Sequence, residues 1–93
     1  SLDTMHVAKA FIEVEGFNAR GFTTRDQTFC LLARRIGKIS DYVVFLCPPQ
    51  SYGSISFYNI GALSLADSIV TTAKVNDSFK EACAEKHEAF YCV

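Results

Sequence analysis

Several features are absent from this sequence, and each absence excludes a class of protein. No apolar stretch approaches the roughly 18–20 residues that a membrane-spanning helix needs. Lys and Arg number 9 against 10 Asp and Glu, a balance that argues against strong binding to a nucleic-acid backbone. A nucleophile elbow, a glycine-rich phosphate loop and a paired metal motif are also missing, and His6 and His87 lie far apart. We therefore do not expect an enzyme.

The cysteine pattern excludes the common zinc and redox motifs. None of the four cysteines belongs to a C-x-x-C pair, and they sit inside apolar stretches: Cys30, Cys47, Cys83 and Cys92. This usage predicts reduced, packed thiols in an intracellular protein of the nucleus or cytoplasm. One alternative is a metal site from Cys83, His87 and Cys92, but it lacks a fourth ligand. No cofactor or metal is expected.

The composition that remains is typical of one globular domain. The 93 residues are 49% hydrophobic and 20% charged, without a repeat, a low-complexity tract or a linker. We expect a single domain over residues 1–93. The chain starts at Ser1 without a charged segment ahead of an apolar core, which predicts an excised domain without a signal peptide.

Periodicity predicts the order of the elements. Ala10, Ile12 and Val14 fall on one face and Phe11, Glu13 and Glu15 on the other, as in a half-buried strand. Thr24 to Gln27 has capping-box spacing before an amphipathic helix that ends at Gly37. Further elements are expected in this order: a strand at 39–47, a strand at 52–58, a helix capped by Asn59 and reaching 73, a helical segment at 76–85 and a strand at 89–93.

The order β-α-β-β-α-β predicts a fold of the α+β class. It is the order of the ferredoxin-like sandwich, a four-stranded antiparallel sheet with two helices on one face. Here a helical extension precedes the last strand. The other sheet face is then open, and we expect it to carry the function.

Local spacing makes the chain resemble one family with this fold, the RNA recognition motif. The third-strand octamer of that family is matched within 50–57, QSYGSISF, at Tyr52, Gly53, Ile55 and Phe57. The turn at 36–39, the first strand near Ile12 and the apolar positions 63 and 66 also fit. The resemblance extends to about residue 73. Its implied fold is RRM-like, and its implied function is binding of single-stranded RNA on the open sheet face.

The resemblance also implies where RNA would bind. The family's three base-stacking positions correspond to Glu13, Tyr52 and Ser54, so only Tyr52 keeps an aromatic ring. Other aromatic side chains on the same face are expected to assist: Phe11, Phe45, Tyr58 and either Phe90 or Cys92. The RNA phosphates would contact three basic residues near the first strand and its loop: Lys9, Arg20 and Arg25.

The alternative hypothesis is a protein-protein interaction domain of the same fold, or a homodimer, that has lost its RNA-stacking residues. Glu13 places negative charge where RNA would lie, and Phe11, Val43 and Phe45 would form an apolar face. Large exposed apolar patches mark interfaces. The expected partner is thus single-stranded RNA or a protein, and not a membrane.

Overall fold

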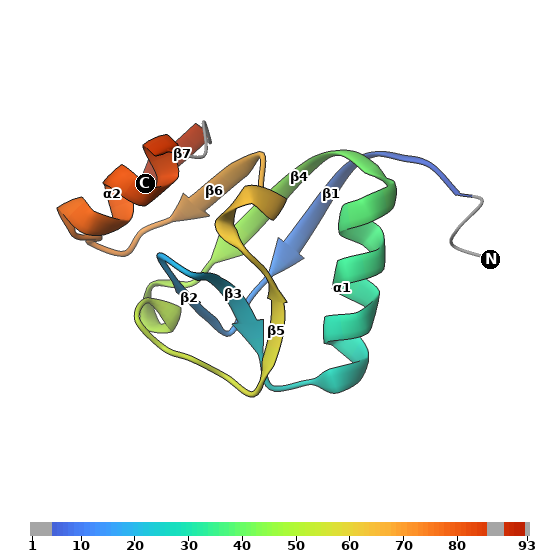
Figure 1. Ribbon diagram of the computed structural model, residues 1–93, viewed down its shortest axis with the longest axis horizontal. Coiled ribbons are helices and arrows are strands. Elements are labelled where there is room, and N and C mark those ends of the chain that lie inside the picture. The colour runs from blue at the N-terminus through green and yellow to red at the C-terminus, as the bar shows by residue number, and fades with distance from the viewer. Residues whose placement is uncertain (1–4, 86–88, 93) are drawn as a thin grey trace.

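The computed structural model describes residues 5–85 and 89–92, which form two sheets and two helices (Figure 1). The main sheet has the strand order β1-β4-β6-β7, and every neighbouring pair in it is parallel. A smaller antiparallel sheet has the order β2-β3-β5. The bounds of the elements are β1 Val7–Glu13, β2 Gly16–Asn18, β3 Gly21–Thr24, α1 Gln27–Ile39, β4 Ser40–Cys47, β5 Tyr58–Gly61, β6 Ser68–Thr71, α2 Asp77–Glu85 and β7 Ala89–Cys92, with 3-10 turns η2 Pro49–Ser51 and η3 Leu63–Leu65.

This α+β fold corrects the ferredoxin-like prediction, because the large sheet is parallel and not antiparallel. The strand expected at 52–58 does not form; a 3-10 turn at 49–51 and a positive φ of 80° at Gly53 redirect the chain, and β5 begins only at Tyr58. β5 then joins the smaller sheet through β3. The stretch from Gly16 to Thr23, whose polar residues predict a loop, forms most of the β2-β3 hairpin.

The second predicted helix is also wrong. Residues 68–71, Ser-Ile-Val-Thr, form strand β6 of the main sheet, and Asn59, expected to cap a helix, lies inside β5. Ile, Val and Thr have stiff β-branched side chains that favour strands over helices. Packing inside a sheet thus outweighs the helix-like spacing of apolar residues that predicted a helix at 59–73.

Helix α1 confirms the first predicted helix, with different ends. The Asp26 carboxylate, and not the Thr24 hydroxyl, caps it by accepting from the Phe29 N–H at 3.0 Å. The helix continues through Gly37 to Ile39. Cys30 and Ala33 are its buried residues, and Phe29 and Ile36 pack against the core beside them. Leu32, expected on the same buried stripe, is 44% exposed.

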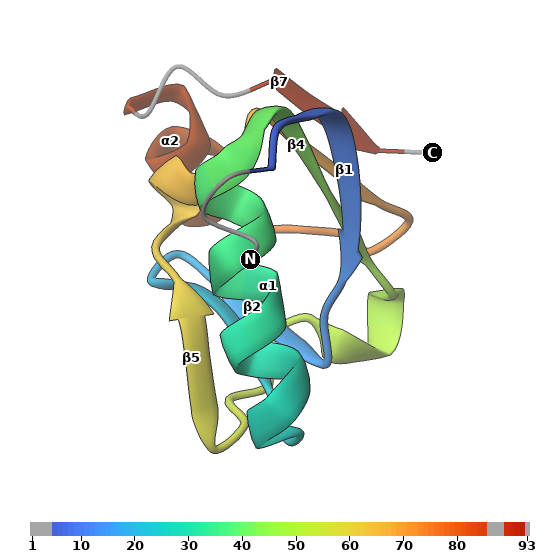
Figure 2. The same ribbon diagram turned by 90° about the vertical axis from the view of Figure 1, so that its right-hand side faces the viewer.

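The core lies between the main sheet and the elements packed on one of its faces. Its largest fully buried side chains include four Phe residues: Phe17, Phe22, Phe45 and Phe79. Phe22 of β3 stacks on Phe45 of β4, which joins the two sheets. Figure 2 shows α1, α2 and β5 all on the same side of the main sheet. Within the described residues, the opposite face of that sheet is therefore left uncovered.

Neither described helix is both long enough and apolar enough to cross a membrane.

Candidate interaction face

The uncovered side of the main sheet is formed by every second residue of three strands. The ladders pair Lys9 with Tyr42, Phe11 with Val44, and Leu46 with Val70. Paired residues in a sheet share a face, and side chains alternate between faces along each strand. We define the outer face by these residues: Lys9, Phe11 and Glu13 of β1, Tyr42, Val44 and Leu46 of β4, and Ser68 and Val70 of β6.

The apolar side chains of the outer face are most exposed on its edge strand, β1. Phe11 is 63% exposed although it lies in a strand. Val44 beside it is buried, while Leu46 and Val70 are half-buried. Parallel sheets are almost always covered on both faces. An apolar parallel sheet with one uncovered face is therefore the feature of this molecule that most needs a partner.

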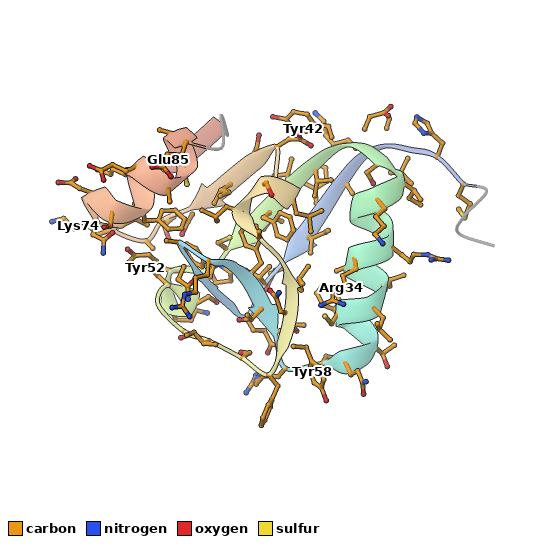
Figure 3. All side chains as sticks on the ribbon, in the orientation of Figure 1. Arg34, Tyr42, Tyr52, Tyr58, Lys74 and Glu85 are labelled. Carbon is orange, nitrogen blue, oxygen red and sulfur yellow. The ribbon has the colours of Figure 1, made fainter. Side chains whose placement is uncertain are left out.

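Three polar side chains of the outer face, Lys9, Tyr42 and Ser68, contact one another. The Tyr42 hydroxyl and the Ser68 hydroxyl form a hydrogen bond across β4 and β6. The Lys9 Nζ atom lies 5.3 Å from the centroid of the Tyr42 ring, within range of a cation–π contact. Figure 3 shows Tyr42 on the upper margin of the molecule, away from Tyr52 and Tyr58. Lys9 is thus oriented over the sheet, while Glu13 lies exposed at the other end of β1.

The structure brings only three of the nine predicted site residues together. Lys9, Phe11 and Glu13 lie on the outer face, as expected for a site on the open sheet. Phe45 lies on the inner face and is 0% exposed under Phe22, so its predicted place on the open face is wrong. The protein-interaction hypothesis also placed Phe45 and Val43 on an exposed apolar face. Both are buried core residues, so this placement is wrong.

Tyr52 is a packed residue outside the main sheet. Its ring lies 5.4 Å from that of Phe17 and 5.8 Å from that of Phe79, measured between centroids. Its hydroxyl accepts from the Asn76 N–H at 3.1 Å. The segment around residues 76–79 therefore lies against Tyr52, and the ring is not displayed beside Phe11 on one sheet face.

Tyr58, Ser54 and Arg20 lie near a second exposed apolar group, beyond the smaller sheet. Phe57 is 92% exposed, Ile55 is 71% exposed, and the Tyr58 ring lies 6.3 Å from the Phe57 ring. A cavity of about 330 Å³ beside them is lined by the β2-β3 hairpin, by residues 55–57 and by β5, among them Arg20, Thr23 and Asn59. This group lies away from the outer face.

Arg25 is held by Glu15 and is not a free cation. Its backbone N–H and its Nε donate to the Glu15 carboxylate at 2.8 and 2.9 Å, and the Thr24 hydroxyl donates to it at 2.8 Å. These bonds, led by the Arg25 backbone N–H, lower the pKa of Glu15 from 4.5 to about 2. The cluster fixes the start of α1 and is structural.

Cys30, Cys47 and Cys83 are buried free thiols, as the sequence predicts. Burial, with a smaller effect of neighbouring Cys83, raises the pKa of Cys47 to about 12, so this thiol is unreactive. The alternative metal site falls on His87 and the Cys92 side chain, which lie outside the described residues. Among those described, no three His, Cys, Asp or Glu residues gather in a way that could hold a metal ion.

Sequence reasoning missed Ser68 and Val70 because residues 59–73 were interpreted as a helix. The signal was present, since Ile69, Val70, Thr71 and Thr72 form a β-branched run.

Comparison with known proteins gives one distant similarity. No family model matches this chain. The chain is 25% identical over 87 residues, 92% of its length, to the uncharacterised HTH-type transcriptional regulator YulB of Bacillus subtilis (strain 168). The chain spans about a third of the length of that regulator.

The described part of this chain contains no helix-turn-helix. That motif needs two helices joined by a turn of about 3–4 residues, whereas α1 and α2 are separated by residues 40–76, which contain three strands. The described part of this chain therefore has a sheet-based fold and not that motif.

Proposed function

We propose that this chain is a protein-interaction domain that packs its outer face against another protein surface. The observation that carries the proposal is Phe11, a 63% exposed aromatic residue on the edge strand of a parallel sheet whose outer face is uncovered within the described residues. Burying such a ring removes a large apolar area from water, which drives association. The two charged residues on β1 flank Phe11 and provide the polar rim that interfaces usually have.

The distant similarity supports a place for this domain in a regulatory protein. The matched protein is named an HTH-type transcriptional regulator, and the match covers about a third of it. Because the sheet-based fold is not a helix-turn-helix, we assign this domain to contacts between proteins and leave DNA binding to other parts of such a regulator. The three buried free thiols fit the reducing interior of a cell, and we propose an intracellular location.

Binding of single-stranded RNA stays a prediction. Lys9 and Phe11 on the outer face could meet a phosphate and a base. Against it, the Tyr52 ring is packed between Phe17 and Phe79, and Glu13 lies on the same face as Phe11. A protein partner therefore suits the outer face better.

An NMR titration separates the two functions. Amide spectra of the chain are recorded with a pool of single-stranded RNA and, separately, with the apolar dye anilinonaphthalene sulfonate. We expect the dye to shift signals of Phe11, Leu46 and Val70, and the RNA to shift none. RNA shifts that cluster on the outer face and weaken with added salt would overturn the proposal.

Two variants test whether the dye reports the outer face. Val70→Lys places a charge within that face and should weaken dye binding. Ile55→Lys is the matched control, because Ile55 is exposed and apolar but lies in the second exposed group. If Ile55→Lys loses dye binding and Val70→Lys does not, the dye binds at the second exposed group and not at the outer face.

A further inference from the structure

We infer that a second copy of this chain binds at the β1 edge of the outer face, where the two β1 strands form an antiparallel pair centred on Phe11 and the two outer faces become continuous. This inference rests on the proposed function and names its partner. It follows from three observations on β1: a free edge, a register in which its backbone groups match, and a charge pattern that complements itself.

The first observation is the edge. In the described part of the main sheet, β1 has β4 as its one neighbour and forms the outer strand. It is seven residues long and contains no proline. In Figure 1 the strands of the main sheet follow one another from β7 through β6 and β4 to β1, which lies at the end opposite β7. Such an edge presents unpaired N–H and C=O groups and is a template for another strand.

The second observation is the direction of the backbone groups. The Val14 N–H donates to the Leu46 carbonyl at 3.2 Å, so the backbone groups of Val14 point toward β4. Because these groups alternate along a strand, those of Glu13, Phe11 and Lys9 point away from β4. The residues with outward backbone groups are thus the same residues whose side chains form the β1 row of the outer face.

The third observation is the charge pattern. Lys9 and Glu13 stand two residues before and two residues after Phe11. In an antiparallel pair with Phe11 opposite Phe11 of the partner subunit, Lys9 lies opposite Glu13 of the partner subunit, and the reverse. A two-fold axis through Phe11 therefore forms two Lys9–Glu13 ion pairs between the subunits and brings the two exposed Phe11 rings together.

Other registers lose these matches. A shift that keeps the backbone groups in phase sets Lys9 or Glu13 opposite Phe11, so the charges face an aromatic ring. A shift by an odd number of residues sets outward backbone groups against inward ones, and the ladder cannot form. The Phe11-centred register is thus the one in which hydrogen bonds, rings and charges agree.

Sedimentation of the full 93-residue chain tests the inference through charge reversal. We expect the wild-type chain to form a concentration-dependent dimer. Lys9→Glu or Glu13→Lys replaces attraction by repulsion at both symmetric pairs, and we expect each to raise the dimer dissociation constant about tenfold or more.

An equal mixture of the two single variants is the sharper measurement. One chain is then acidic at both positions and the other is basic at both, so all charges across the pair are again opposite. We expect dimer to return in the mixture and in the double variant Lys9→Glu/Glu13→Lys. Within one chain the two residues sit at opposite ends of an exposed row, so an effect on folding alone would not be restored by mixing.

Cross-linking tests whether the two-fold axis passes through Phe11. Phe11→Cys sets two thiols opposite each other with Cα atoms about 5.5 Å apart, and we expect rapid dimer formation with a short bis-maleimide reagent. Ile55→Cys is the matched control, because Ile55 is also an exposed apolar residue, 71% against 63% for Phe11, and lies outside the pair. Equal cross-linking of the two variants would overturn the Phe11-centred register.

The outcomes distinguish this inference from the proposed function. A chain that stays monomeric at every concentration overturns the second copy as partner. The outer face then remains an interaction site for a different protein if Val70→Lys still lowers dye binding and Ile55→Lys does not. If neither variant affects dye binding, the proposed function fails as well.

Discussion

The Phe22 ring lies parallel to the Phe45 ring, with centroids 3.8 Å apart and an interplanar angle of 6°. The contact fixes the smaller sheet on the inner face of the main sheet. It explains why Phe45 is fully buried, while Phe11, one strand away on the opposite face, is exposed.

The first prediction concerns the two faces of the main sheet. We expect Phe45→Ala to lower the free energy of unfolding by about 3–5 kcal/mol, since it leaves a cavity under Phe22. Phe11→Ala should cost less than about 1 kcal/mol in the dilute monomer, because its ring is largely solvated there. Urea unfolding at low protein concentration measures both. Equal losses would mean that the faces are assigned wrongly.

The second prediction concerns pH. The pKa of Glu15 is lowered from 4.5 to about 2 by the bonds from Arg25 and Thr24. A carboxyl with a lowered pKa in the folded state stabilises the protein above pH 4.5, and this contribution is lost as the pH falls toward 2. Glu15→Gln should therefore be less stable than wild type at neutral pH, and the difference should shrink as the pH falls through this window.

The control for Glu15 is Glu81→Gln, a change of the same chemistry at an exposed position of α2. Urea unfolding between neutral and strongly acid pH gives the comparison. A difference for Glu15→Gln that stays constant with pH would show that the carboxylate is not held by Arg25 and Thr24.

The third prediction concerns the start of α1. Asp26→Ala removes the acceptor of the Phe29 N–H and should cost about 1 kcal/mol of stability. Asp26→Ser should recover most of it, because serine is also a good N-cap. Circular dichroism during thermal unfolding measures both variants. If Asp26→Ala had no effect, the helix would be capped elsewhere, with Thr24 as the first candidate.

The fourth prediction concerns Cys47. Burial raises its pKa to about 12, and the thiolate is the reactive form, so iodoacetamide should not modify it in the folded chain at neutral pH. In denaturant it should react fully, as peptide mass mapping would show. The exposed thiol of Ile55→Cys supplies the reactive control in the folded state. Rapid modification of native Cys47 would contradict the buried position.

Much of the local structure could be predicted from the sequence. The alternation around Ala10 and Ile12, the apolar run at 39–47, the helix stripe around Ala33, and the helical segment before residue 85 correspond to β1, β4, α1 and α2. These elements were predictable because their apolar residues repeat with the period of one structure. Residues 59–73 were not, because their apolar residues fit a helix stripe as well as short strands.

Of the candidate site, the sequence determined Lys9, Phe11 and Glu13 as one row of a strand, with charge on either side of an aromatic ring. The sequence alone did not determine the direction of each strand or its neighbours in the sheet, because these depend on where each connecting segment returns to the sheet. The tertiary structure alone decided that β4 and β6 run parallel to β1, that Phe45 and Tyr52 belong to packed layers, and that Phe11 remains exposed. The physical reason is that a sheet residue is buried or displayed according to which face the helices and the second sheet cover, and that choice is made by contacts between distant segments.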